Sequence, residues 1–467
     1  MSVNENIGIA RKQRVFAKLE TVLGTLVFPS GTTDFIRPAG NAEISQNPAF
    51  VDSEELQNTL DVLDRFQNAL PAGKWKIPMY LRPSGTVGSA PQGDALFEAL
   101  QGDKEAVTAA ICTIGATAST SMIEINTIAG GILPEKGVVT LAGTVSEKVH
   151  YTGITRVARN STSATLTGCT RGYASTTAAT HALAQVVTLS SIFYKQELTS
   201  PSLTIWIESD HFVQGIYGAS VDEAVFDITN EGAVKVTFSG QGMKMVYAGT
   251  SALSSNSVAT NTHIHVDDAS LFSADAYIYN KTKHDAGSAA VYSKISSVDT
   301  AANTLTLANN LGTTGATDDV ICGYLPLDET VIGDPIESKD TTLQIDDVAA
   351  TIKSCSLTIR APKKYVDDEV GNDYATDFME DTRDINSSLN VYFRKADAKY
   401  FTDGLANEEP TILFTFGDTA GSIIDVYFKK CNLEVPTINY ASPAIELTMP
   451  MKALGTIGED SCEIVVR

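Results

Sequence analysis

The sequence is poor in several residue types on which other classes of protein depend. Its 467 residues include only 6 cysteines, which are scattered and form no CxxC pair, and only 2 tryptophans. Scattered thiols in a chain of this size indicate reduced cysteines in a protein made in a cytoplasm. Two tryptophans offer little material for the aromatic-lined groove of a glycan-binding or glycan-active protein.

Basic side chains are scarce as well. The chain has 34 Lys and Arg against 56 Asp and Glu, a net charge of −22. A surface this acidic argues against a protein that grips nucleic acid, because phosphates are held by Lys and Arg patches. No run approaches the roughly 18 apolar residues of a membrane-spanning helix, so we expect no membrane insertion. The first 16 residues lack the apolar segment of a signal peptide.

Motifs of known catalytic sites are missing. Neither GxSxG, HExxH, GxGxxG nor a P-loop occurs. His263 and His265, with Asp267 and Asp268, alternate as ligands on one strand face would, but no further ligand completes a metal site. A polar strand edge is the favoured interpretation. The remaining histidines are isolated, and we assign them no function: His150, His181, His211 and His284. We therefore predict no enzyme, no metal and no cofactor.

The sequence is instead rich in Thr, Ser, Ala, Val and Gly and shows few helical patterns, which predicts a mainly β protein. The clearest pattern lies between residues 211 and 249. An alternating run, VKVTFS, begins at Val234 and follows a turn at Asn230–Gly232. We predict a hairpin with one strand over 215–228 and a return strand over 233–243.

This pattern recurs near the C-terminus. Residues 444–449 (AIELTM) align with residues 233–238 (AVKVTF) at a constant offset of 211. Ser442-Pro443 stands where Glu231-Gly232 stands in the first occurrence. The preceding strand matches as well, with a shift of about one residue. These matches predict an internal duplication.

Two further segments, 109–190 and 250–328, show short strands separated by turns in a similar order. They are predicted to be weakly related copies of one small β-module, inserted into or beside the larger fold. The expected strands are 123–125, 137–141, 148–152, 164–167 and 185–189 in the first module and 263–266, 277–279, 291–295, 304–307 and 320–323 in the second.

Helices are expected at only a few places. Residues 91–101 give the best signal, with Asp94 as the capping residue, and residues 397–406 hold the corresponding position in the second half. Residues 53–69 fit a helix by propensity. Residues 11–28 have helical or mixed spacing, but Gly24 and the Thr-rich end weaken a helix there, and an arm that packs on another part of the protein is the alternative. Further strands are expected at 74–81, 342–345, 351–359, 389–393, 412–416 and 423–431.

Three segments together carry a resemblance to a known family. They are GDALFEAL at residues 93–100, the hairpin region at residues 207–242 and PAIELTMPMKALGTIGED at residues 443–460. This combination resembles the tail tube (major tail) proteins of long-tailed bacteriophages. The stretches VHYTGITR, LTGCTRGYASTTAATHA and VVTL in the first module also resemble β-modules that recur in phage structural proteins.

The resemblance implies two tandem tail-tube-like β-sandwich or barrel domains, each with a short helix, plus the two small modules. The expected boundaries are 1–108 with 191–249 for the first domain, 109–190 and 250–328 for the modules, and 329–467 for the second domain. Tube subunits join side by side into rings that stack through loops or an arm around a lumen. A duplicated subunit implies trimeric, pseudo-hexameric rings, with the modules outside the tube.

The implied partners are further copies of the chain, the tape measure protein and the tail-end proteins of the virion. DNA passes through the lumen into the host without specific binding, and the implied location is the virion tail. Two other functions fit the composition: another virion decoration or adhesion protein built from β-modules, and a glycan-binding β-protein.

An acidic lumen wall would repel the phosphates of passing DNA. We therefore expect the lumen-facing residues to include Glu223, Asp227 and Glu231 in the first half and Glu434 and Glu446 in the second. A solvated outer sheet face is an equal alternative for each of them.

Overall fold

The computed structural model describes residues 9, 11–56, 58–59, 61–105, 109–112, 120–126, 132–158, 161–210, 212–440 and 443–467. Over these residues the chain forms seven β-sheets and three short α-helices, so the prediction of a mainly β fold is confirmed. His211 and Ser442, which entered the sequence arguments, lie outside the described residues.

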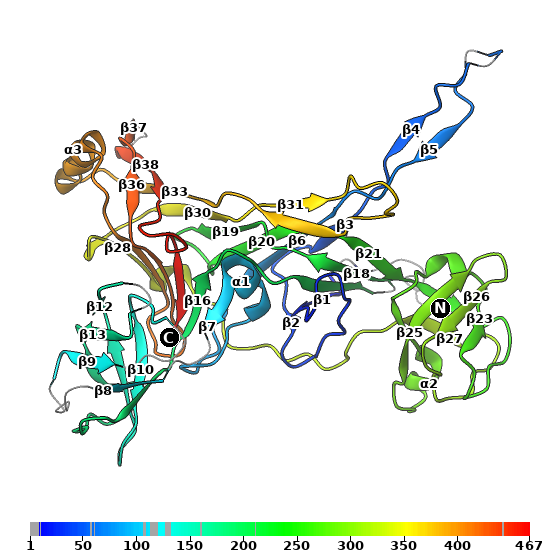
Figure 1. Cartoon of the computed structure of the whole chain (residues 1–467), viewed down its shortest axis with the longest axis horizontal. Coiled ribbons are helices and arrows are strands. Elements are labelled where there is room, and N and C mark those ends of the chain that lie inside the picture. Colours follow the sequence, from blue (N-terminus) through cyan, green and yellow to red (C-terminus); the bar gives the residue numbers. More distant parts are fainter. Residues whose placement is uncertain are drawn as a thin grey trace.

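The largest sheet runs through both halves of the sequence (Figure 1). Its order is β3-β6-β20-β19-β30-β33-β38-β36, and β37 also pairs with β38 beside β36. The strands of this nine-stranded sheet are β3 (Glu43–Ser45), β6 (Gly73–Tyr80), β19 (Glu223–Ile228), β20 (Lys235–Gly242), β30 (Ser354–Arg360), β33 (Asp384–Tyr392), β36 (Cys431–Leu433), β37 (Thr437–Asn439) and β38 (Glu446–Ala453). The halves meet where β19 pairs with β30, from Glu223↔Arg360 to Ile228↔Cys355.

Two outer sheets pack on one face of the nine-stranded sheet and share a single core with it. The first has the order β2-β1-β17-β18-β21, and the second β29-β28-β34-β35-β39-β16-β7. Their strands are β1 (Gln13–Leu19), β2 (Phe35–Ile36), β7 (Gly102–Glu105), β16 (Ile192–Gln196), β17 (Leu203–Ser209), β18 (Phe212–Ala219), β21 (Lys244–Ala248), β28 (Thr341–Ile345), β29 (Val348–Ala350), β34 (Ile412–Phe416), β35 (Ile424–Phe428) and β39 (Glu463–Val466). A separate two-stranded ribbon, β31 (Lys363–Val366) with β32 (Asp377–Glu380), connects β30 to β33 along the chain.

One strand order occurs twice in this sandwich. The outer path β2-β1-β17-β18-β21 corresponds to β29-β28-β34-β35-β39, and the path β3-β6-β20-β19 in the large sheet corresponds to β30-β33-β38-β37. The sequence offset of 211 carries β20 onto β38 from first residue to last, 235 to 446 and 242 to 453. Each half also has one helix after its β6 or β33 strand: α1 (Asp94–Gln101) and α3 (Lys399–Ala406).

The central strands of the outer sheets are buried on both faces. In β17, Ile205 faces the sandwich core, whereas its neighbour Trp206 belongs to a second apolar cluster on the opposite side. Gly215 on β18 makes room for this tryptophan, because a Cβ built there would lie 2.6 Å from the indole ring. Strands buried in this way are continuous apolar runs rather than alternating ones.

The two small modules are closed barrels with the same strand path. In residues 109–190 the strand order begins β8-β15-β10-β11, and the chain runs from β11 directly into β12. β12 pairs with β13, β13 with β9 and β9 with β8, which closes the barrel. In residues 250–328 the path β22-β27-β24-β25-β26-β23 returns through a bridge between Leu253 and Val266. The strands are β8 (Ala109–Cys112), β9 (Ile123–Asn126), β10 (Gly137–Leu141), β11 (Glu147–Tyr151), β12 (Gly153–Thr155), β13 (Ser163–Thr167), β15 (Val186–Leu189), β22 (Thr250–Ala252), β23 (His263–His265), β24 (Tyr277–Asn280), β25 (Tyr292–Asp299), β26 (Thr304–Leu307) and β27 (Val320–Gly323). β14 (Thr170–Tyr173) is added beside β11 in the first barrel, and the short helix α2 (Lys281–Asp285) follows β24 in the second.

Each barrel packs on the outward face of one outer sheet (Figure 1). Phe193 of β16 and Val465 of β39 complete the core of the 109–190 barrel. The 250–328 barrel contacts the Trp206 cluster through Tyr277 and through Phe28, which stacks on Tyr292 with ring centroids 4.6 Å apart. Both barrels therefore lie on the side of the sandwich away from the exposed face of the nine-stranded sheet.

Most strands expected in the two barrels are confirmed within about one to four residues at their ends, and the helices at 91–101 and 397–406 are present as α1 and α3. The single strand expected over 215–228 is wrong. The chain leaves the outer sheet after β18 and enters the nine-stranded sheet at β19, so the hairpin consists of β19 and β20 alone. Residues 215–221 are all buried, and no exposed residue between β18 and β19 marks the corner in the sequence.

Neither residues 11–28, whose spacing is helical or mixed, nor the described part of residues 53–69, which fits a helix by propensity, forms a helix. Residues 13–19 form strand β1, whose apolar side chains are needed on both of its faces. Within residues 53–69 the chain instead returns from β4 (Phe50–Asp52) to β5 (Arg65–Gln67), which form a separate hairpin. Asp94 does not cap α1; Gly93 occupies the N-cap, and the Asp94 carboxylate accepts hydrogen bonds from Lys104 and Tyr194.

Candidate assembly surfaces

The exposed face of the nine-stranded sheet is polar and electrically balanced. Along most of its strands these side chains alternate with buried ones, and they are mostly Ser, Thr, Asn, Gln and charged residues. The charged residues in these strands are Lys74, Lys76, Lys235, Arg360 and Lys452 against Glu43, Glu223, Asp227, Asp384 and Glu446. Cross-strand pairs join them, such as Arg360 Nε with Glu223 at 2.7 Å and Lys452 Nζ with Asp384 at 2.8 Å. We call this surface the polar face.

The structure places three of the five predicted carboxylates on the polar face. Glu223 and Asp227 lie on β19 and Glu446 on β38, where it binds Lys353. Glu231 lies in the exposed turn after β19, and Glu434 is exposed just after β36. That they face a lumen stays a prediction. On this face the folded chain brings a cation close to each of Glu223, Asp227 and Glu446, so the polar face itself is not acidic.

The nine-stranded sheet ends at β3 on one side and at β36 and β37 on the other. β37 lies on β38 as β19 lies on β20, since Ile438 pairs with Leu447 and Phe226 with Val236, and the repeat offset carries Val236 onto Leu447. Phe226 is fully buried because β30 covers its strand, whereas Ile438 is 39% exposed. Val435 and Tyr440 beside it are exposed too. This edge therefore has apolar side chains like those of β19, but no strand in the position of β30 covers it in the described structure.

A long hairpin, residues 46–72, projects from the body between β3 and β6 (Figure 1). We call it the arm. Its apolar side chains are solvent-exposed: Phe50, Val51, Leu56, Val62, Leu63 and Phe66. An isolated two-stranded hairpin is only marginally stable in water, and exposed apolar groups gathered on one element mark interaction surfaces. The arm is therefore a candidate contact with another molecule.

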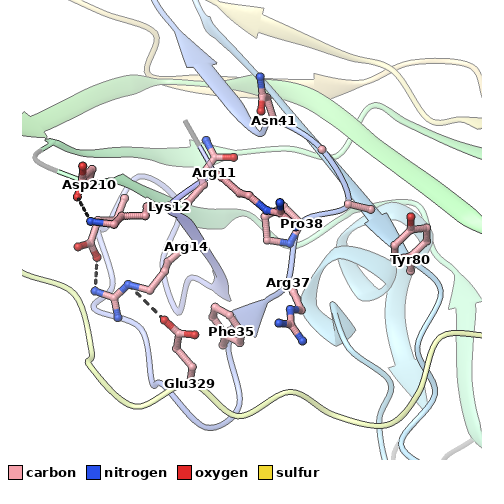
Figure 2. A pocket seen from close by; sticks show the side chains of 14 residues that line it. Arg11, Lys12, Arg14, Phe35, Arg37, Pro38, Asn41, Tyr80, Asp210 and Glu329 are labelled. Carbon is pink, nitrogen blue, oxygen red and sulfur yellow. Dashed lines mark hydrogen bonds and ion pairs between the residues drawn. The ribbon is translucent and has the colours of Figure 1, made fainter. Parts of the chain in front are cut away.

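A cleft of about 790 Å³ opens beside the start of β1 and the end of β6 (Figure 2). Four cations line it: Arg11, Lys12, Arg14 and Arg37. Lys12 Nζ lies 3.1 Å from Asp210, and Arg14 pairs with Glu208 and, at 3.6 Å, with Glu329. Arg11 and Arg37 are exposed and form no ion pair within the described part of the chain. We call this surface the basic cleft.

Comparison with protein-family models and with curated proteins finds no match. Function is therefore inferred from the surfaces themselves. Among the described residues no group of three metal-type ligands exists, and no helix is long and apolar enough to cross a membrane. His263 and His265 are exposed on β23, where His265 Nδ1 lies 2.9 Å from the Thr304 hydroxyl.

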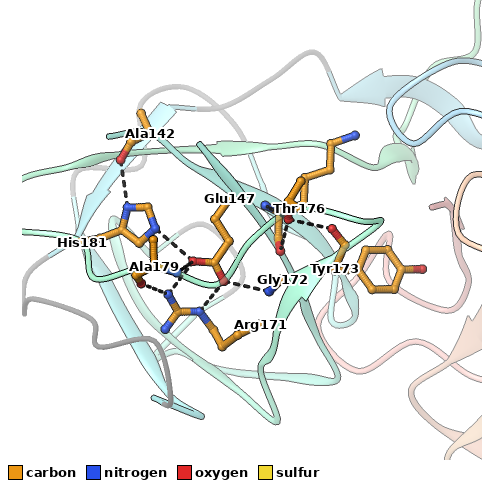
Figure 3. Close-up of polar contacts among 9 residues, drawn as sticks. Ala142, Glu147, Arg171, Gly172, Tyr173, Thr176, Ala179 and His181 are labelled. Atoms are coloured by element: carbon orange, nitrogen blue, oxygen red, sulfur yellow. Dashed lines mark hydrogen bonds and ion pairs between the residues drawn. The ribbon is translucent and has the colours of Figure 1, made fainter. Parts of the chain in front are cut away.

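Sequence reasoning missed a buried ionic cluster in the 109–190 barrel (Figure 3). The Glu147 carboxylate is fully buried and accepts two hydrogen bonds of 2.7 Å from the Arg171 guanidinium. The backbone N–H groups of Gly172 and Ala179 donate at 2.8 and 2.9 Å, and His181 Nε2 lies 3.0 Å away. One carboxylate thus fixes the loop from residue 171 to 181 against β11.

The environment of Glu147 sets its acid response. Burial alone would raise its pKa, but hydrogen bonds from Arg171, Ala179, Gly172 and His181 lower the pKa from 4.5 to about 2. A carboxyl whose pKa falls on folding contributes stability that is complete above pH of about 4.5 and is lost as the pH falls towards 2.

We therefore expect residues 171–181 to stay protected from amide hydrogen exchange down to about pH 4 and to lose protection near pH 2. Exchange measured at several pH values by mass spectrometry, corrected for the intrinsic pH dependence of exchange, tests this. Loss of protection in this loop between about pH 6 and 5, where Glu147 is still ionised, would contradict the assignment.

Proposed function

We propose that the protein is the structural subunit of the tail tube of a long-tailed phage. Its copies join side by side into rings whose lumen is lined by the polar face, and stacked rings form the channel for DNA ejection. The observation that supports this most is the pairing of β19 with β30, which joins the two repeats within one chain. The strand that corresponds to β19 in the second repeat and the strand that corresponds to β30 in the first repeat both lie at free edges of the sheet.

The two free edges of the sheet correspond to the two strands that pair inside the chain, β19 and β30. β37 is the counterpart of β19, as described above. β3 is the counterpart of β30, because Ile44 pairs with Trp75 on β6 and Leu357 with Ser387 on β33. The next partners along the sheet, Gly240 and Met451, are related by the same repeat offset.

Joining β37 of one copy to β3 of a second copy repeats the internal junction. Such a heterologous contact closes into a ring when the rotation permits, and closure removes both open edges. Each copy supplies two halves, so we propose three copies and six halves in a ring. In the template register, Ile438 of one copy lies opposite Ile44 of the next, as Phe226 lies opposite Leu357.

The polar face suits a lumen. Its cations and anions neutralise one another across strands, and hydroxyl and amide side chains fill the positions between them. DNA binds proteins largely through phosphate neutralisation with counterion release, so a face without excess cations gives it little to hold. The two barrels lie on the opposite side, which leaves the channel open. In the virion, the tape measure protein and the tail-end proteins are the proposed further partners.

Negative-stain electron microscopy of the purified protein, with its mass from light scattering, tests this function. We expect trimers, with three times the chain mass of 49.7 kDa, and hollow tubes of stacked rings at high concentration. A monomer that stays a monomer at millimolar concentration, and also when mixed with purified tail-tip complexes, would contradict it. Glycan binding by such a monomer would favour the alternative of a glycan-binding β-protein.

A further inference from the structure

Two arginines of the basic cleft have no carboxylate to neutralise them. Arg11 and Arg37 are exposed and form no ion pair within the described part of the chain, and both side chains lie beside Pro38 (Figure 2). The other two cations of the cleft, Lys12 and Arg14, are each held by carboxylates. In a chain of net charge −22, two such arginines beside one cleft are a local excess of positive charge.

A third arginine adds to this excess just after β6. Burial, and next the positive charge of Arg37, lower the pKa of the Arg82 guanidinium, while Asp334 offsets part of the shift. Arg82 donates one hydrogen bond of 2.9 Å to the Gly333 carbonyl, but its buried Nε has no acceptor among the described residues. Guanidinium groups that repel one another in this way are stabilised when an anion from solution binds near them.

The charge and shape of these groups select the kind of anion. A phosphate monoester carries about −1.5 to −2 charges near pH 7 and three acceptor oxygens. Two guanidinium groups supply a matching positive charge and planar sets of donors that bind such oxygens in pairs. A single carboxylate would neutralise only one of them. A chain of phosphates, such as DNA, is repelled by the acidic surface around the cleft.

The cleft also has room for an organic group attached to the phosphate. Its volume of about 790 Å³ lies within the range of about 300–1,000 Å³ that is usual for small-molecule sites. Tyr80 lines it with a ring that is 38% exposed, and Phe35 lines it as a buried side chain. The exposed Asn41 amide can both donate and accept hydrogen bonds.

We propose that the basic cleft is a binding site for a phosphate monoester, with Arg11 and Arg37 on the phosphate and Tyr80 and Asn41 on the organic group. All residues that line the cleft belong to one chain. The site therefore goes beyond the proposed function and does not depend on the assembly of rings.

Isothermal titration calorimetry of the purified full chain in phosphate-free buffer of low salt tests this site. The probes are adenosine monophosphate, ribose 5-phosphate, inorganic phosphate, ribose without phosphate and a short single-stranded DNA. The cleft variant is Arg11→Gln with Arg37→Gln. A matched control removes two cations of the 250–328 barrel, Lys281→Gln with Lys294→Gln, which pair with surface carboxylates.

We expect saturable binding of at least one of the two monoesters, and no binding of ribose. Loss of charged hydrogen bonds in the cleft variant is expected to weaken that binding by about tenfold or more, whereas the control matches the native chain. Tyr80→Ala is expected to weaken the binding of the ester and to leave that of inorganic phosphate unchanged. Equal melting temperatures show that the variants are folded.

Four results would overturn the assignment. They are no saturable binding of either monoester, equal affinity of the folded cleft variant and the native chain, inorganic phosphate bound as tightly as the esters, and DNA bound more tightly than the esters. None of these results bears on whether the chain forms rings, so this inference and the proposed function fail separately.

Discussion

Replacing Ile438 with lysine is expected to stop ring formation while leaving the subunit folded. Ile438 is 39% exposed in the single chain, so a lysine there is solvated and leaves the fold unchanged. At a junction built like β19–β30 the same position is enclosed, as Phe226 is. An unpaired ammonium buried there costs about 3 kcal/mol or more per junction, which weakens each contact by roughly 100-fold or more.

Light scattering and native mass spectrometry measure the effect as the concentration at which half the chains are monomeric. The control is Val157→Lys, which places the same charge at a fully exposed apolar residue of the 109–190 barrel. Equal trimer stability for the Ile438 variant and the control would show that β37 is not the ring edge. A melting temperature that falls only for the Ile438 variant would mean that the residue supports the subunit fold.

Replacing Glu147 with alanine is expected to unfold the 109–190 barrel locally. The change leaves the Arg171 guanidinium buried without its carboxylate and removes the acceptor of the Gly172 and Ala179 N–H groups. Breaking a buried pair by removing one partner typically costs about 3–5 kcal/mol, because the remaining charge is uncompensated. A small barrel with a core of its own has little stability to lose.

Limited proteolysis and hydrogen exchange of the full chain measure this effect region by region. We expect rapid cleavage within residues 132–190 and unchanged protection in β19, β20 and β30, because the sandwich has a separate core. Glu124→Ala, an exposed carboxylate of the same barrel, is the control. Equal protease resistance of both variants would show that the cluster does not hold the barrel together. Tubes assembled from the Glu147 variant would be further support for a barrel outside the channel.

The sequence revealed most clearly the strands that have one solvent-exposed face. The alternation after Val234 predicted β20, and the offset of 211 identified β38 as its counterpart. It missed β1 and β17, because strands buried on both faces do not alternate. The run LTIWI at 203–207 sends Ile205 to one core and Trp206 to another, and no local pattern distinguishes this from a helix segment.

The surfaces were harder to predict from the sequence than the strands, for a similar reason. The carboxylate at Glu223 was visible in the sequence, but its partner Arg360 is distant along the chain and is placed only by the β19–β30 register. The basic cleft assembles side chains from near Arg11, Arg37 and Glu208, which no spacing rule connects. Charge balance on a sheet is a property of strand pairing, so the spacing of charges along the chain does not show that the polar face carries as many cations as anions.

The covalent link between the two halves has a consequence for how quickly rings appear. Because β19 and β30 belong to one polypeptide, half of the six junctions in a proposed ring form by intramolecular docking, at an effective concentration set by the connecting chain. Three contacts between chains remain, of which two require a diffusional encounter and the third closes the ring, and fewer particles lose translational freedom than in a ring of six separate chains. A duplicated subunit therefore nucleates rings at lower concentration than two unlinked halves would, and every ring contains the halves in strict alternation.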